Sequence, residues 1–203
     1  MATWRELEAE LASRLAHASL DERVVFAVGV AERLMRVQEA LPGDEQAEYT
    51  LGLRPLLNAL WEAALGNPAA FGEIKHGMGE YLLSDYCHND GPDGAGDADE
   101  PAAAAVLHTA AAYLFGAGDL ATVVSGCAVE AADERSTTVD GHDDAPDEVL
   151  AAELHRQLQD LALITRHSGS LRHAGLGLDI ETSTRLHREL RIPLSSGEAG
   201  AGP

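Results

Sequence analysis

The sequence has few cysteines, and they are not spaced for a metal site or a disulfide framework. Cys87 and Cys127 are the only two in 203 residues, and they form no CxxC pair. Small secreted domains usually carry several closely spaced cysteines, so two isolated thiols are typical of reduced cysteines in the cytoplasm. The pattern excludes a disulfide scaffold and a zinc ribbon, and it indicates no redox role.

Long apolar runs are also absent. The stretch from Val24 to Ala31 is apolar throughout, but it falls well short of the roughly 18 residues that a membrane-spanning helix needs. The first residues, MATWRELEAE, are partly acidic and lack the basic patch and apolar segment of a secretory signal. We therefore expect a cytoplasmic protein without a membrane span.

Basic residues are scarce. Lys and Arg together number 14 against 34 Asp and Glu, which gives a formal net charge of −20. The acidity is concentrated between residues 51 and 150, where the only basic residues are Arg54, Lys75 and Arg135. Nucleic acids and anionic membranes have charge of the same sign and would be repelled. The balance favours a basic protein partner or a bound cation.

The pattern that is present is helical, and one segment organises it. Residues 20–41 contain the apolar stretch just described, and a helix that is apolar all round must be covered on several sides. Ser19 and Glu22 form a capping box at its start, and Pro42-Gly43 ends it. This segment is the predicted central helix.

Further helices follow from apolar residues at spacings of three and four. They are predicted over 4–17, 54–65, 71–82, 101–115, 119–134 and 150–164, with a shorter one at 183–190. Pro55 would lie in the first turn of its helix. The helices at 101–115 and 119–134 form a hairpin whose buried side chains would be Val106, Ala110, Tyr113, Leu114, Val123, Cys127 and Ala131.

The last long helix has the clearest two-sided pattern. Its leucines at positions 150, 154, 158 and 161 would face inward, and Glu153, Arg156, Gln157 and Asp160 would face water. No strand-like alternation recurs, although GLGLDIE hints at one strand. The predicted fold is all-α: a single-domain bundle of six or seven helices around a buried central helix. The helical domain would span residues 1–168, and 169–203 would be a basic, Gly-rich extension, partly disordered, with a flexible tail.

Several segments together resemble a known family. FAVGVAERLM, LRPLLNALWEAAL, AAAAVLHTAAAYLFGAGDLATVVSGCAVEAADE and EVLAAELHRQLQDLALI are similar to the small all-helical bacterial family of unknown function typified by the YjaG-like proteins, especially its actinobacterial branch. The resemblance covers about residues 20–164, and its most distinctive parts are the Ala-Glu-Arg triplet and the Trp-Glu pair. It implies a compact helical domain but no established activity and no catalytic residues. The insert after Cys87 and the tail after Thr165 depart from it.

Two polar loops carry the candidate metal ligands. The first, SDYCHNDGPDGAGDADE, and the second, ERSTTVDGHDDAPDE, are rich in carboxylate and imidazole groups that suit a divalent cation. The candidate ligands are Asp85, His88, Asp90, Asp140, His142, Asp143 and Asp144. The alternative interpretation is that both loops are solvated acidic connections.

More specific chemistry is not supported by the sequence. DDAPD fits the spacing of a diphosphate-binding DDxxD motif, but it precedes a helix where Asp is favoured anyway, and no second motif follows. His142-Asp143 lies in a turn rather than at the end of an apolar helix, unlike the pair of a helical metal phosphohydrolase. His108 and Cys127 are expected to be core residues, since neither belongs to a nucleophile or ligand pattern.

Two classes of function therefore remain. The first is a non-enzymatic interaction or regulatory protein whose acidic middle region binds a basic protein. The second is a divalent-metal-dependent hydrolase or small-molecule binder that uses the two Asp/His loops. The first needs no catalytic group and no cofactor, and the second needs the two loops to converge.

Overall fold

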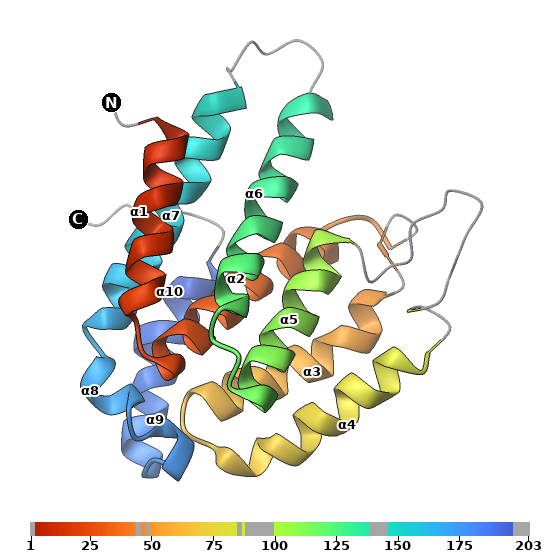
Figure 1. The fold of residues 1–203 in the computed structure, drawn as a ribbon. Coiled ribbons are helices and arrows are strands. Elements are labelled where there is room, and N and C mark those ends of the chain that lie inside the picture. The colour runs from red at the N-terminus through yellow and green to blue at the C-terminus, as the bar shows by residue number, and fades with distance from the viewer. Residues whose placement is uncertain are drawn as a thin grey trace.

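A computed structural model describes residues 3–43, 46–47, 49–84, 87, 100–138 and 146–196, with the backbone alone at 136–138 and 146. Every regular element within these ranges is a helix, and no strand occurs in them (Figure 1). The all-α prediction is confirmed. In the same part of the chain, no helix combines the length and hydropathy that crossing a bilayer requires.

Capping boxes begin the first two helices. Helix α1 runs Trp4–His17, and α2 runs Leu20–Glu39. The backbone N–H of Glu22 donates to the Ser19 hydroxyl, and the Glu22 carboxylate accepts from the Ser19 backbone N–H at 2.8 Å. These bonds satisfy donors that a helix start leaves free, as the sequence predicted.

Helix α2 is buried along its apolar stretch. Every residue from Val24 to Glu32 is buried, and Val28 is 0% exposed. The helix packs against α3 (Tyr49–Ala64), α5 (Pro101–Phe115), α6 (Leu120–Thr138), α7 (Pro146–Thr165) and α10 (Ile192–Ser195). These contacts explain how an all-apolar surface is kept from water.

Helix α3 begins earlier than predicted. It starts at Tyr49 rather than near residue 54, so Pro55 lies inside the helix and not in its first turn. Proline removes a backbone hydrogen bond at such a position, at a cost of about 3 kcal/mol. Tyr49 is 0% exposed, and the apolar surface that it buries offsets part of that cost.

A tight connection joins α3 to the next helix. Gly66 has φ +106°, a conformation that favours glycine, and it is followed by a short 3₁₀ turn, η1 (Pro68–Ala70), and by α4 (Phe71–Leu82). The Gly66 carbonyl accepts from the backbone N–H of Leu178 at 3.0 Å. This bond attaches the segment at Leu178, which is far away in the sequence, to the turn at Gly66.

The α5/α6 hairpin forms as predicted, but α6 presents a different face. Gly116 ends α5 with φ +65°. Val106, Ala110 and Cys127 are buried. Val123, predicted to be buried, is exposed, and the buried residues of α6 are instead Ala121, Val124, Ser125, Cys127, Ala128 and Ala132. The polar Ser125 lies on this face because it bonds to α7, which the apolar pattern of α6 alone does not reveal.

The C-terminal residues pack on the core. They form α8 (Ser168–Leu171), a 3₁₀ turn η4 (Ala174–Leu176), α9 (Ile180–Leu186), a π-helical segment η5 (His187–Arg191) and α10. The sequence placed the end of the helical domain at residue 168, whereas the buried core continues through Leu171, Leu186, Leu190 and Leu194. Within GLGLDIE, residues 177–179 form no strand: Gly177 has φ +89°, Leu178 bonds to the turn at Gly66, and Ile180 begins α9. The predicted tail, SSGEAGAGP, spans residues 195–203; Ser195 is instead buried at the end of α10, and residues 197–203 lie outside the described residues.

Substitution of Val28 tests the importance of α2. Val28→Asp buries an unpaired charge and should lower the free energy of unfolding by about 4 kcal/mol, as measured by urea denaturation. Val37→Asp, on the same helix at a position that is 44% exposed, is the control and should cost less than about 1 kcal/mol. Equal stability of the two variants would contradict the burial of Val28.

Candidate functional site

The polar interior is organised by two adjacent residues of α2. Glu32 is 1% exposed, and the side chain of Arg33 is 11% exposed. Neighbouring residues on a helix point about 100° apart, so the two charges meet different helices. Each lies in its own ionic cluster, and these two clusters are the strongest candidates for a functional site in the described part of the chain.

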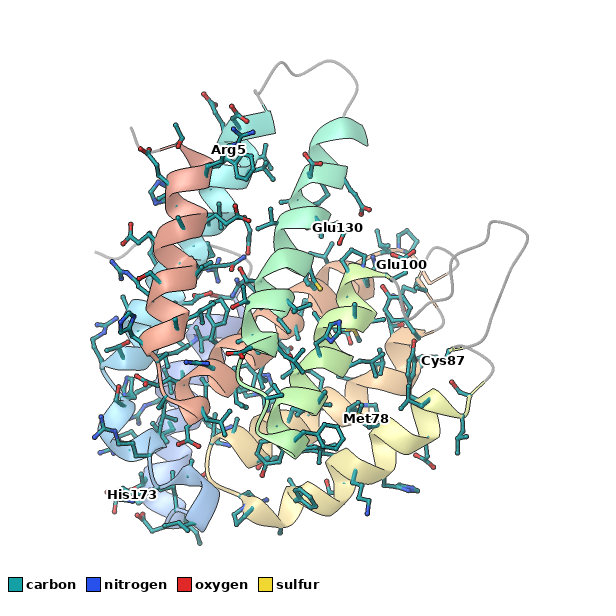
Figure 2. All side chains as sticks on the ribbon, in the orientation of Figure 1. Arg5, Met78, Cys87, Glu100, Glu130 and His173 are labelled. Atoms are coloured by element: carbon teal, nitrogen blue, oxygen red, sulfur yellow. The ribbon has the colours of Figure 1, made fainter. Side chains whose placement is uncertain are left out.

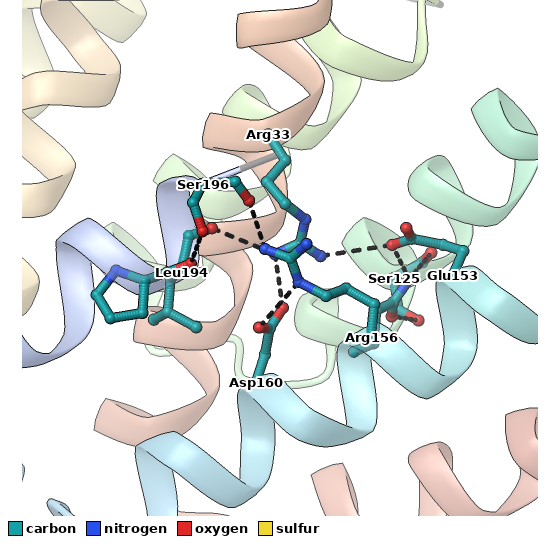
Figure 3. Close-up of polar contacts among 9 residues, drawn as sticks. Arg33, Ser125, Glu153, Arg156, Asp160, Leu194 and Ser196 are labelled. Atoms are coloured by element: carbon teal, nitrogen blue, oxygen red, sulfur yellow. Dashed lines mark hydrogen bonds and ion pairs between the residues drawn. The ribbon is translucent and has the colours of Figure 1, made fainter. Parts of the chain in front are cut away.

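Arg33 is the centre of the first cluster (Figure 3). Its Nη1 lies 2.6 Å from Oδ2 of Asp160 and donates to the carbonyl of Leu194 at 3.4 Å. Its Nη2 lies 3.4 Å from Oε1 of Glu153. One guanidinium therefore joins α2 to two carboxylates of α7 and to the backbone of α10.

Arg156 extends the cluster on the side of α7. Its Nε lies 3.5 Å from Oδ1 of Asp160, and its Nη2 donates to the carbonyl of Ser196 at 2.5 Å. Asp160 thus lies between two guanidinium groups. Burial raises the pKa of Asp160, and the two nearby guanidinium charges oppose that rise without cancelling it.

Helix α6 joins the same cluster through neutral groups. The Ser125 hydroxyl donates to Oε1 of Gln157 at 2.6 Å, and Nε2 of Gln157 donates to Oε1 of Glu153 at 2.9 Å. Gln157 is 0% exposed, so these bonds satisfy an amide that would otherwise be costly to bury. The cluster therefore connects four helices.

This arrangement corrects the prediction for α7. The four leucines of α7 are buried as predicted, but Glu153, Arg156, Gln157 and Asp160 do not face water. The polar face of the helix is covered by α2, α6 and α10, because Arg33 on α2 provides a partner for its carboxylates. An isolated helical pattern shows polarity but not whether a distant residue pairs with it.

Glu32 is the centre of the second cluster. Its Oε2 accepts from Nη1 of Arg54 at 2.8 Å and from Nε1 of Trp61 at 3.1 Å, and its Oε1 accepts from Nε of Arg36 at 2.8 Å. Arg54 also holds both carboxylate oxygens of Glu39, at 2.6 and 2.7 Å. Burial acts to raise the pKa of Glu32, but Arg36, Arg54 and Trp61 outweigh it and the pKa is lowered.

A pocket of about 240 Å³ adjoins the first cluster. Three arginines and one glutamate contribute to a wall that is otherwise apolar: it is lined by Val30, Arg33, Leu34, Val37, Ala128, Arg135, Glu153 and Arg156. The guanidinium groups of Arg33 and Arg156 are already bonded to carboxylates and carbonyls. The pocket therefore offers no nucleophile and no acid–base pair, and its arginines act first as structural counter-ions.

The predicted metal ligands cannot be placed. Asp85, His88, Asp90, Asp140, His142, Asp143 and Asp144 all lie outside the described residues. Among the residues that are described, no group of three or more His, Cys, Asp or Glu side chains could hold a metal ion. Convergence of the two loops stays a prediction.

Cys127 and His108 differ in burial. Cys127 is buried in the core, and burial raises the pKa of its thiol, which disfavours the reactive thiolate. The prediction that Cys127 is a core residue is confirmed. His108 is only partly buried, and its neighbour Thr109 is the fully buried polar residue, with its hydroxyl donating to the Ala105 carbonyl at 2.6 Å.

Comparison with known proteins adds no assignment. No protein-family model matches the sequence, and no match was found to curated proteins or to solved structures.

The first cluster can be tested by removing its cation. Arg33→Met removes an ion-pair partner of Glu153 and leaves Asp160 with Arg156 alone, so the free energy of unfolding should fall by about 3 kcal/mol. Arg14→Met, which breaks an exposed pair with Glu10, should cost less than about 0.5 kcal/mol.

A double variant separates the ion pair from simple packing. Arg33→Met combined with Asp160→Leu removes both charges and should recover roughly half of the loss. Additive losses in urea denaturation would show that the two residues are not energetically coupled.

Proposed function

We propose that the protein is a non-enzymatic interaction or regulatory protein of the cytoplasm, whose acidic surface binds a basic protein partner. The observation that carries the proposal is the distribution of charge. More than half of the basic side chains are engaged in ion pairs with the chain's own carboxylates. The excess of acidic residues is thereby left at the surface.

Exposed carboxylates gather toward one end of the bundle, which we call the acidic end. It consists of Glu6 and Glu8 on α1, Glu130, Asp133 and Glu134 on α6, and Asp147 and Glu148 on α7. Helix α7 contacts both α1 and α6, so the three helices run side by side there (Figure 1). Arg5 and Glu130 mark this end in Figure 2. Such a field attracts a basic surface and repels nucleic acid.

The architecture proposed for this protein is a single-domain bundle arranged around α2. It is supported by the contacts of α2 with α3, α5, α6, α7, α8 and α10. Membership of the YjaG-like family is also a proposal. It rests on the sequence resemblance over about residues 20–164.

The alternative function, a metal-dependent hydrolase or small-molecule binder, depends on the two Asp/His loops. No described residue supports it, because the buried carboxylates Glu32 and Asp160 are held by arginines and are not available to a metal. The interaction protein is the better-supported proposal.

Affinity capture from a native extract tests the acidic end. Glu8→Gln, Glu130→Gln and Glu148→Gln together remove three of its charges, and the triple variant should lose a basic protein that the parent retains. A matched variant, Glu73→Gln with Glu80→Gln and Glu181→Gln, removes three exposed charges elsewhere and should retain it. The interaction should weaken as salt rises, because screening acts over about 8 Å at physiological ionic strength. Equal loss in both variants, or retention in both, would contradict the proposal.

Metal titration tests the alternative. At constant ionic strength, millimolar calcium, magnesium, manganese or zinc should leave the melting temperature unchanged, since no metal site is proposed. Asp143→Asn with Asp144→Asn should fold at least as well as the parent, because fewer like charges remain. A metal-specific rise in melting temperature that these substitutions abolish would favour the hydrolase or binder.

A further inference from the structure

A second pocket of about 240 Å³ lies away from both ionic clusters. It is formed where the beginnings of α2 and α4 meet the ends of α3 and α5 and the turn η4. Its lining residues are Leu20, Asp21, Val24, Ala63, Ala64, Phe71, Tyr113, Ala174 and Gly175. His173, next to this lining, marks in Figure 2 the end of the molecule opposite Arg5, so the pocket is remote from the acidic end.

The pocket contains one carboxylate, that of Asp21. Apart from its own backbone N–H, the Asp21 side chain has no hydrogen-bond or ion-pair partner among the described residues. Burial raises the pKa of Asp21, and the charge of Glu22 adds to the rise. A partly buried carboxylate without a counter-ion favours binding of a cation.

The basic side chain closest to Asp21 in sequence, that of Arg23, has partners elsewhere. Arg23 donates to the carbonyls of Ala16 and Ala18 and pairs with Asp119 at 3.2 Å. Its guanidinium is therefore already bonded to these groups and not to Asp21. Within the lining set, no arginine, lysine or histidine neutralises Asp21.

Two aromatic rings form part of the same wall. The ring centroids of Phe71 and Tyr113 are 6.4 Å apart with an interplanar angle of 50°. Phe71 is 48% exposed, although its apolar ring would normally be covered. Burial and the charge of Asp21 raise the pKa of the Tyr113 phenol, so the phenol stays neutral. The charge of Asp21 therefore acts on Tyr113. Aromatic faces attract organic cations within about 6 Å.

These features fit one class of ligand. An alkylammonium group has a positive charge for the carboxylate, C–H or N–H groups for the aromatic faces, and an alkyl stem for the apolar wall of Val24, Ala63 and Ala64. A bare metal ion would find only one carboxylate in this lining, and an anion would be repelled by it.

We propose that this pocket binds an alkylammonium group, with Asp21 as the counter-ion and with Tyr113 and Phe71 as its aromatic walls. The site is independent of the acidic end and does not depend on the function proposed above. The ammonium group comes either from a free amine or from a lysine side chain of a protein, and the same chemistry recognises both.

Titration followed by amide NMR shifts tests the site. Butylammonium and butyltrimethylammonium should shift amides at the start of α2 and in η4, with dissociation constants of about 1 mM, as expected for ligands of this size. The uncharged 3,3-dimethylbutan-1-ol has a similar shape and should bind at least about tenfold more weakly. Equal binding of the alcohol, or no shift with either cation, would overturn the proposal.

Variants assign the roles of the residues. Asp21→Asn should weaken butyltrimethylammonium binding about tenfold, Asp21→Glu should retain part of it, and Tyr113→Leu should also weaken it. Glu73→Gln, an exposed substitution on α4, is the control and should leave the affinity unchanged. Melting temperatures show that each variant is folded, and unchanged affinity in a folded Asp21→Asn protein would contradict the assignment.

A further arm distinguishes the two sources of the ammonium group. An acetylated and amidated lysine peptide presents the same cation on a backbone. Binding of this peptide as tight as that of butylammonium indicates a protein lysine as the ligand. Binding of the free amines alone indicates a small amine, because the exposed Leu20 and Phe71 at the pocket then exclude the peptide backbone.

Discussion

The structure depends on the neutralisation of two charges that lie side by side in a buried helix. Glu32 and Arg33 follow directly after the apolar stretch of α2, and burying either without a partner would cost several kcal/mol. Glu32 requires Arg54 and Trp61 from α3, whereas Arg33 requires Asp160 from α7. The apolar stretch alone would accept many helix arrangements, but these pairs specify which helices lie on which side.

The same pairing determines the character of the surface. Arg33 and Arg54 pair with buried carboxylates, so their positive charges are not available to the acidic residues of the surface. The net charge of −20 follows from the composition, and the internal pairs leave most of its excess to the other carboxylates. The two proposed surfaces differ in kind: the acidic end has many exposed carboxylates, whereas the pocket has a single carboxylate, Asp21, in a lining of apolar and aromatic groups.

Local sequence rules predicted the features that depend on near neighbours. The helical class, the capping box at Ser19 and the inward leucines of α7 follow from spacing within one or two turns. Rules of this kind miss long-range pairing, which is why Gln157 and Asp160 were expected in water although Ser125 and Arg33 cover them. The start of α3 was predicted too far along the chain, because proline usually marks the first turn of a helix. Burial of Tyr49 extends α3 to the N-terminal side of Pro55. The candidate metal ligands lie outside the described residues, and the pocket at Asp21 has no motif, since its residues come from five separate segments.

The packing of α10 on α2 constrains the order in which the core of the protein forms. A Cβ at Gly29 would lie 3.1 Å from the Cβ of Leu194, so the glycine leaves a notch in α2 that this leucine fills. During synthesis α2 is made before α10, so the notch at Gly29 is not filled by Leu194 until α10 has been made. Closure of the core at Gly29 therefore requires α10 and follows the packing of the helices that lie between α2 and α10 in the sequence.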